Sequence, residues 1–181
     1  VVEEKNGKAL ALRVVGLDQP YSTRQYWDMG RARNLAEFEA AEKRLQNPMF
    51  TVMYADRDGH IMHLFGGRTP VRPKGNYNWA GIVPGDTSVT LWTKTHPYEE
   101  LPRVVDPATG WLQNANDPPW TTTFPPALDP NKFPSYMAPR FMHFRAQRSA
   151  RMLMEDPRIS FDELVRYKHS TRMELADRIL D

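Results

Sequence analysis

The segment from Pro97 to Pro139 constrains the fold more than any other, because it carries ten of the sixteen prolines in the chain. Proline lacks a backbone N–H and fixes φ, so such a segment forms neither a helix nor a central strand. It also carries more aromatic side chains than a disordered linker does: Trp111, Trp120, Phe124, Phe133 and Tyr136. We therefore predict an ordered, irregular loop that packs on a surface of the protein.

Local patterns before this loop predict a strand and a helix. Lys8–Val14 alternates, which favours a strand with three apolar side chains on one face: Leu10, Leu12 and Val14. Asn34 is the expected N-cap of a helix, with Glu37 as its capping-box partner. The helix should continue to Asn47-Pro48 and carry three apolar side chains at helical spacing: Phe38, Ala41 and Leu45.

A β-hairpin is predicted next, from a strand over Met49–Ala55, a tight turn at Asp56–Gly59 and a return strand over His60–Gly66. The turn sequence is similar to the start of a calcium loop, but no closing Glu follows, which favours the hairpin turn. His60 and His63 lie three residues apart on the return strand and should face opposite sides of the sheet, which disfavours a shared metal ion.

Three helices are expected after the loop, over residues from about 139 to 155, from 160 to 168 and from about 171 to 180. The middle helix begins with a capping box made by Ser160 and Glu163. Together with the predicted strands, these helices indicate the α+β fold class.

Composition excludes several classes of site and partner. A net charge of +2, with 24 basic and 22 acidic residues, does not suggest a nucleic-acid or membrane-surface protein. There is no long apolar run that predicts a membrane span. The chain has no cysteine, which excludes disulfides, thiolate catalysis and Cys-based zinc sites. It opens Val-Val-Glu-Glu, with neither an initiator Met nor a signal peptide, and we interpret it as a processed or excised fragment.

Two amides, Asn114 and Asn116, stand one residue apart before Asp117-Pro118-Pro119. In an extended segment, side chains at positions i and i+2 point the same way, so both amides could reach one small polar target. A fixed amide N–H is a donor that stabilises a developing oxyanion. The alternative is an Asx turn that closes a strand before a loop.

Arginines cluster after the proline-rich segment, and their spacing is helical in part: Arg140, Arg145, Arg148 and Arg151. One interpretation is a solvated helix face. The other is a single inward Arg near a developing negative charge or a substrate carboxylate. There is no Gly-x-Ser-x-Gly elbow and no glycine-rich phosphate loop, so these residues alone identify no reaction.

Five segments, in this order, resemble the β-chain of the penicillin acylase family of N-terminal nucleophile hydrolases. The match covers nearly the whole chain, and its segments are Met29–Phe38, Tyr54–Ile61, Asn78–Gly81, Leu101–Gly110 and Asn114–Pro119. Leu10–Arg13 and Tyr54–Ile61 look most like the acylases that cleave long acyl amides, including acyl-homoserine lactone and aculeacin acylases.

The resemblance implies that residues 1–181 are a single segment of such a β-chain. The expected fold is part of the family's four-layer αββα sandwich, with some central strands and flanking helices. The family's nucleophile and general base is an N-terminal Ser with its α-amino group. Val1 cannot serve as that residue, so the resemblance implies that the nucleophile region and the α-chain are missing and that the fragment alone is inactive.

The family's site residues carry over to two positions. The resemblance places the oxyanion-hole amide at Asn116, with Asn114 as its neighbour, and the supporting arginine at Arg145. Arg140 and Arg148 are the alternatives if the register differs.

The implied reaction is hydrolysis of an N-acyl amide, such as a β-lactam side chain, an acyl-homoserine lactone or a similar lipopeptide amide. The implied partners are the rest of the β-chain and the α-chain of one precursor, in the periplasm or outside the cell. No cofactor is expected in this chain, and the family's calcium ligands would lie mostly outside it. Two alternatives stay open: a non-catalytic domain that binds a partner through residues 97–139, and an inactive family member that has lost its nucleophile.

Overall fold

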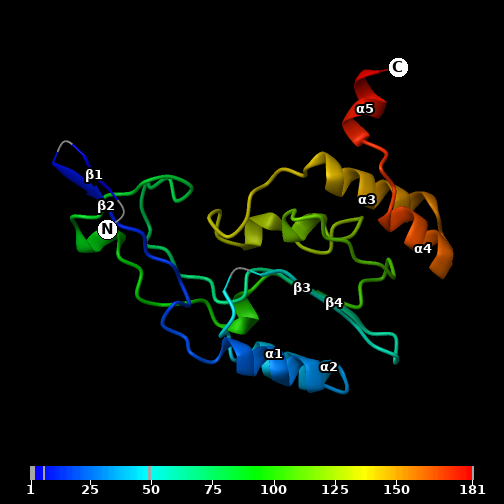
Figure 1. Cartoon of the computed structure of the whole chain (residues 1–181), viewed down its shortest axis with the longest axis horizontal. Helices are drawn as coiled ribbons and strands as arrows, with labels where there is room; N and C mark the ends of the chain where they lie inside the picture. The colour runs from blue at the N-terminus through cyan, green and yellow to red at the C-terminus, as the bar shows by residue number, and fades with distance from the viewer. Residues whose placement is uncertain (1–2, 6, 49, 181) are drawn as a thin grey trace. The chain divides into compact units, whose positions relative to one another are not determined.

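The computed structural model describes residues 3–5, 7–48 and 50–180. They form two compact units, one from residues 1–50 and 66–101 and the other from residues 51–65 and 102–181 (Figure 1). Val1 and Met49, which entered the sequence-based predictions, lie outside the described residues.

The first unit begins with a two-stranded antiparallel ribbon of β1 (Glu3–Lys5) and β2 (Lys8–Leu10). Helices α1 (Ser22–Arg31) and α2 (Leu35–Glu42) then lie side by side (Figure 1). Two short 3-10 helices complete this unit: η1 (Ser88–Thr90) and η2 (Tyr98–Glu100).

The strand predicted over Lys8–Val14 is wrong beyond Leu10, where β2 ends. Leu12 is 75% exposed, so the apolar face that the alternation predicted is not buried within the described part of this unit. Without a covered face, alternation alone does not stabilise a strand.

The N-cap of α2 is confirmed, since Asn34 Oδ1 accepts a hydrogen bond from the Glu37 N–H at 2.9 Å. The Glu37 side chain reaches back to the N–H of Arg33 at 2.9 Å, one residue before the expected partner. The helix ends at Glu42, earlier than predicted, and Leu45 lies beyond it with φ +48° while its side chain stays buried.

A buried polar link joins the two helices. Gln25 of α1, which the sequence analysis left in an unassigned stretch, donates from Nε2 to Glu42 Oε2 at 3.1 Å. Gln25 Oε1 accepts from the N–H of Gln46 at 2.7 Å. Glu42 is 2% exposed, and its Oε1 has no hydrogen-bond partner among the described residues. Burial raises the pKa of Glu42 to about 7.

The second unit contains a three-stranded antiparallel sheet in the order β3 (Val52–Ala55), β4 (Ile61–Leu64), β5 (Arg103–Val105). The predicted hairpin is confirmed, with shorter strands than expected. Its turn is closed by Asp56, whose Oδ1 accepts from the N–H groups of Asp58 and His60, each at 3.0 Å. Strand β5 lies at the sheet edge within the proline-rich segment, where the sequence predicted no strand.

The proline-rich segment is ordered, as predicted. Besides β5 it contains the 3-10 helices η3 (Pro119–Thr121) and η4 (Pro130–Lys132). Trp120 is 6% exposed and donates from Nε1 to the carbonyl of Pro139 at 3.1 Å. Met62 and Leu64 of β4 are buried on one face of the sheet, and Val104 of β5, which pairs with His63, is buried on the other face.

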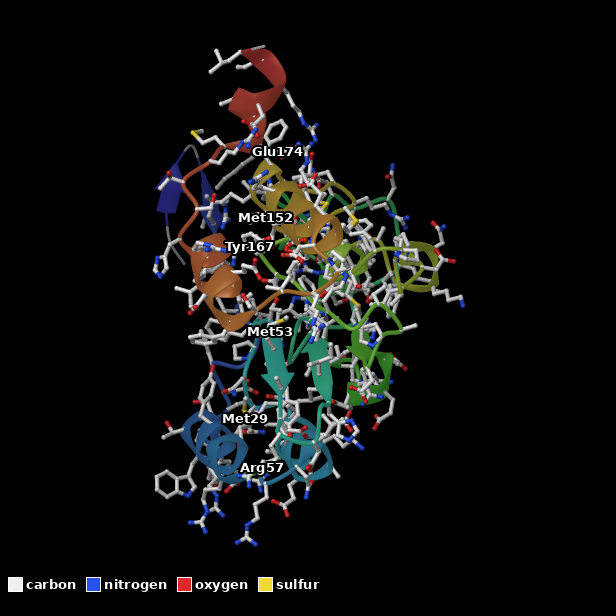
Figure 2. The ribbon with its side chains drawn as sticks, turned by 90° about the vertical axis from the view of Figure 1, so that its right-hand side faces the viewer. Met29, Met53, Arg57, Met152, Tyr167 and Glu174 are labelled. Atoms are coloured by element: carbon white, nitrogen blue, oxygen red, sulfur yellow. The ribbon has the colours of Figure 1, made fainter. Side chains whose placement is uncertain are left out.

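Three helices follow in the second unit: α3 (Phe144–Glu155), α4 (Phe161–Lys168) and α5 (Glu174–Ile179). The capping box of Ser160 and Glu163 on α4 is confirmed. Helix α3 starts five residues later than predicted, because the backbone is still extended at His143. Glu174, labelled on α5 in Figure 2, is buried and accepts hydrogen bonds from Arg151 at 2.6 Å and Arg178 at 2.9 Å.

The described residues therefore confirm the α+β class, with a small antiparallel sheet and helices in one unit and two packed helices in the other. Among these residues, no helix is long and apolar enough to cross a membrane.

We predict that Glu42→Gln stabilises the folded protein at pH 8 and leaves its stability nearly unchanged at pH 4.5. The folded pKa of about 7 lies above the ordinary value of 4.5, so burial of the charge destabilises the fold increasingly as the pH rises from 4.5 to 7. Each unit by which the pKa is raised corresponds to about 1.4 kcal/mol, so the substitution should raise the unfolding free energy at pH 8 by up to about 3 kcal/mol. Gln keeps an oxygen that can accept from Gln25.

The measurement is the unfolding free energy at the two pH values in the protein that carries this chain. Glu155→Gln, at an exposed position on α3, is the control and should change stability by less than about 0.5 kcal/mol at both. An equal effect of Glu42→Gln at pH 4.5 and pH 8 would contradict the assignment.

Candidate active site

The segment with the two candidate amides forms a turn. Asn114 Oδ1 accepts from the N–H of Asn116 at 3.2 Å, and Asn114 Nδ2 donates to the carbonyl of Asp117 at 3.4 Å. Asn116 adopts φ +64°, a left-handed conformation that Asn tolerates better than most residues. Of the two alternatives, the Asx turn is the observed structure, and the extended geometry with two convergent amides is not. The backbone uses the side chain of Asn114, while Asn116 stays exposed.

Asp117 lies under this turn and is only 2% exposed. Its Oδ1 accepts from the N–H of Ala115 at 2.7 Å, and its Oδ2 accepts from Gln113 Nε2 at 2.7 Å. The hydroxyl of Thr121 also donates to Oδ2. Sequence reasoning treated Asp117 only as part of the stop before the two prolines. The sequence did offer one signal for a hydrogen-bonded carboxylate: polar donors stand four positions before and after Asp117, at Gln113 and Thr121.

The structure brings together the two residues that the resemblance selected. Arg145 Nη2 donates to Asn116 Oδ1 at 3.1 Å, although the two positions are 29 apart in the chain. A guanidinium can only donate, so the amide oxygen faces Arg145. The Nδ2 group of Asn116, with its two N–H donors, therefore faces away from the cation.

Helix α3 presents Arg145 at its second position. The helix anchors itself through Ala146 and Ala150, which are 0% and 2% exposed, while Arg145 remains in solvent contact. A positive charge in the first turn of a helix opposes the helix dipole and lowers helix stability slightly. The position of Arg145 is therefore explained by its contact with Asn116 rather than by the stability of α3.

The alternative arginines lie elsewhere. Arg140, before α3, donates to Asn131 Oδ1 at 2.9 Å and to the carbonyl of Pro130 at 3.2 Å. The Nε of Arg148 is buried and has no hydrogen-bond partner among the described residues. Of the candidates named from sequence, Arg145 is the one that the structure pairs with Asn116.

The two histidines of the hairpin have opposite environments. His60 is exposed, and its Nδ1 lies 2.7 Å from Asp106 Oδ2. This hydrogen bond, together with the negative charge of Asp106, raises the pKa of His60. His63 is fully buried, and neither ring nitrogen has a hydrogen-bond partner among the described residues. Burial lowers the pKa of His63 to about 4, although the charge of Asp117 acts in the opposite direction.

Within residues 3–5, 7–48 and 50–180, no three His, Asp or Glu side chains come together in a way that could hold a metal ion.

Comparisons with known proteins agree with the resemblance. A family model described as penicillin amidase matches residues 1–181. The penicillin acylase 2 proenzyme of Pseudomonas sp. (strain SE83) is 37% identical over 87 residues, which is 48% of this chain and 11% of the relative.

The thermostable penicillin G acylase from Alcaligenes faecalis superposes with a TM-score of 0.65 at 20% identity, over 82% of this chain and 25% of its own. At this identity the likeness shows the fold, and it confirms the predicted partial N-terminal nucleophile hydrolase fold. The chain therefore spans only a small part of either relative.

We predict that His63→Leu makes the folded protein less sensitive to mild acid. The folded pKa of about 4 lies below the ordinary value of 6.5, so stability is retained above pH 6.5 and is lost as the pH falls toward 4. An apolar side chain removes this contribution. The loss of unfolding free energy between pH 7 and pH 4.5 should therefore shrink by up to about 3 kcal/mol.

His60→Gln is the comparison, because the pKa of His60 is raised whereas that of His63 is lowered. The raised pKa of His60 stabilises the fold below pH 6.5, and this contribution is lost as the pH rises through the raised value. His60→Gln should thus lower the melting temperature at pH 5.5 more than at pH 8.5. If both variants shifted the melting temperature equally at every pH, the assigned environments would be wrong.

Proposed function

The chain belongs to the penicillin amidase family, and from this premise we propose that the protein carrying it hydrolyses an N-acyl amide, with Asn116 as a donor to the reaction's oxyanion. The observation that supports this proposal most is the hydrogen bond between Arg145 and Asn116. The two residues lie 29 positions apart and come from separate segments of the family resemblance.

In the proposed reaction, the hydroxyl of an N-terminal Ser attacks the amide carbonyl, and its own α-amino group takes the proton. The carbonyl oxygen becomes an oxyanion in the tetrahedral intermediate. The C–N bond then breaks, the amine leaves with a proton, and water hydrolyses the acyl-enzyme. Residue 1 of this chain is Val, so the proposal assigns the Ser to another part of the protein.

Asn116 would act on the intermediate through Nδ2. Arg145 holds the amide oxygen, which fixes the direction of the Nδ2–H bonds before the substrate arrives. Donation from the cation also draws electron density from the amide and makes its N–H a stronger donor. A donor fixed in advance costs no reorganisation as charge develops, which is why such groups stabilise transition states strongly.

The proposal leaves the acyl group open among β-lactam side chains, acyl-homoserine lactones and lipopeptide amides. Penicillins are the first substrates to test, because the names of both relatives refer to them. The proposed partners are the rest of the β-chain and the α-chain of one precursor, in the periplasm or outside the cell, and calcium would be bound mostly by residues outside this chain. Residues 1–181 are proposed as a single segment of that β-chain, inactive by itself.

The alternative of a partner-binding surface over residues 97–139 is less well supported. A binding surface presents its aromatic side chains to solvent. Trp120 is buried, and the other four are half-buried: Trp111, Phe124, Phe133 and Tyr136. Trp120 and Phe133 pack against each other, with ring centroids 6.3 Å apart. An inactive family member would be recognised by mass spectrometry of the mature protein, if no chain begins with Ser.

We predict that Asn116→Ala lowers kcat by ~10²–10³ in the full-length protein, with processing and folding unchanged. The reason is the loss of one oxyanion donor. Asn131→Ala is the matched control, because Asn131 is also an exposed amide that accepts from an arginine of the same unit. Steady-state hydrolysis of an N-acyl amide measures the effect. Activity of Asn116→Ala within about threefold of wild type would rule out the assigned role.

We expect Arg145→Gln to lower kcat by about tenfold, which corresponds to the lower end of a hydrogen bond to a charged group, since Arg145 is exposed. Arg140→Gln removes the equivalent contact to Asn131 and should leave kcat unchanged. The same hydrolysis assay compares the two. Equal losses would indicate a general effect of surface charge and would remove Arg145 from the site.

A further inference from the structure

We propose that the buried carboxylate of Asp117 is the positioning residue of the oxyanion donor, holding the 114–117 turn so that the Asn116 amide meets Arg145. This inference rests on the proposed role of Asn116. It concerns a residue that would never touch the substrate, since Asp117 is 2% exposed.

Asp117 binds the turn directly at its backbone. Its Oδ1 accepts the N–H of Ala115 at 2.7 Å, which fixes the peptide one residue before Asn116. Its own carbonyl accepts Asn114 Nδ2 at 3.4 Å, and Asn114 in turn accepts the N–H of Asn116. The residues on both sides of Asn116 are therefore fixed, and the left-handed φ of +64° is imposed by the turn rather than chosen by the side chain.

Asp117 is itself held in place by a buried hydrogen-bond network beneath the turn. Gln113 Nε2 donates both to Asp117 Oδ2 and to the carbonyl of Thr121, each at 2.7 Å. Thr122 closes the loop, since its carbonyl accepts the N–H of Gln113 at 2.8 Å and its hydroxyl donates to the Gln113 carbonyl at 2.9 Å. Gln113, Thr121 and Thr122 are all at least nine-tenths buried. Charge-assisted hydrogen bonds in such surroundings are strong, so this buried network holds Asp117 rigidly.

The consequence for catalysis is a separation between kcat and KM. The oxyanion exists only after attack on the carbonyl, so a displaced Asn116 weakens the transition state and leaves ground-state binding unchanged. A misplacement of about 1 Å can lower a rate by about 10²-fold. A purely structural role for Asp117 would instead lower the amount of folded enzyme, and its substitution would reduce activity by the same factor with or without the Asn116 side chain.

The test is a double-mutant cycle with Asp117→Asn and Asn116→Ala in the full-length mature enzyme, with hydrolysis of an N-acyl amide as the assay. Asn is isosteric with Asp but places an N–H donor against Gln113 Nε2 or Thr121. We expect Asp117→Asn alone to lower kcat by about 10- to 100-fold with KM unchanged. In the Asn116→Ala background it should change kcat by less than about twofold, because its effect passes through Asn116.

The outcomes are distinguishable. If Asn116→Ala has no effect on kcat, the proposed function fails. If Asn116→Ala is impaired but Asp117→Asn is not, or if the two losses multiply, the positioning role alone is overturned. Asp129→Asn is the matched control, because Asp129 caps η4 by accepting the N–H of Asn131 at 2.9 Å and lies at an exposed turn. It should leave kcat unchanged.

Thr121→Val keeps the test decisive if Asp117→Asn does not fold. Val matches the shape of Thr but removes the hydroxyl that donates to Asp117 Oδ2, and the Gln113 and Ala115 contacts remain. We expect a loss in kcat of about three- to tenfold in the wild-type background and none in the Asn116→Ala background. Equal losses in both backgrounds would overturn the positioning role.

Discussion

The hydrogen bonds that Asp117 accepts organise a segment in which prolines prevent a regular backbone ladder. A chain so rich in proline must satisfy its remaining N–H and carbonyl groups through side chains. Here a single carboxylate binds one backbone N–H, one amide and one hydroxyl, all within four residues on either side. The exposed Asn116 lies between Ala115 and Asp117, the two residues joined by the first of these hydrogen bonds.

The features that sequence predicted correctly are those whose causes are local. The capping box of Ser160 with Glu163, the N-cap at Asn34 and the turn after Asp56 each depend on side chains within a few residues of the backbone that they bind. The family resemblance selected Asn116 and Arg145, which local physics could not do, and their contact appears only in the structure. That pairing depends on how α3 packs through Ala146 and Ala150, which no periodicity encodes.

The errors have equally specific causes. Helix α1 was missed because its buried residue is Gln25, a polar side chain. Its burial is explained only by the hydrogen bond to Glu42, which lies 17 residues away in the chain. Strand β5 was missed because its hydrogen-bond partner, β4, precedes it by about 40 residues. The choice between convergent amides and an Asx turn stayed open in the sequence, and the turn forms because the Asn114 side chain binds the backbone N–H of Asn116. Two buried groups, Glu42 and His63, each keep an atom without a partner among the described residues, and both make stability depend on pH.

The carboxylate of Glu174 has a consequence for the end of the chain. Helix α5 has six residues, fewer than a peptide needs to remain helical in water, because nucleation outweighs the few hydrogen bonds gained. Its first residue accepts from Arg151 of α3 and from Arg178 one turn further on. Docking and helix formation are therefore one cooperative event: α5 is a helix only while it is attached to α3, and its amide protons exchange with solvent only when that attachment opens.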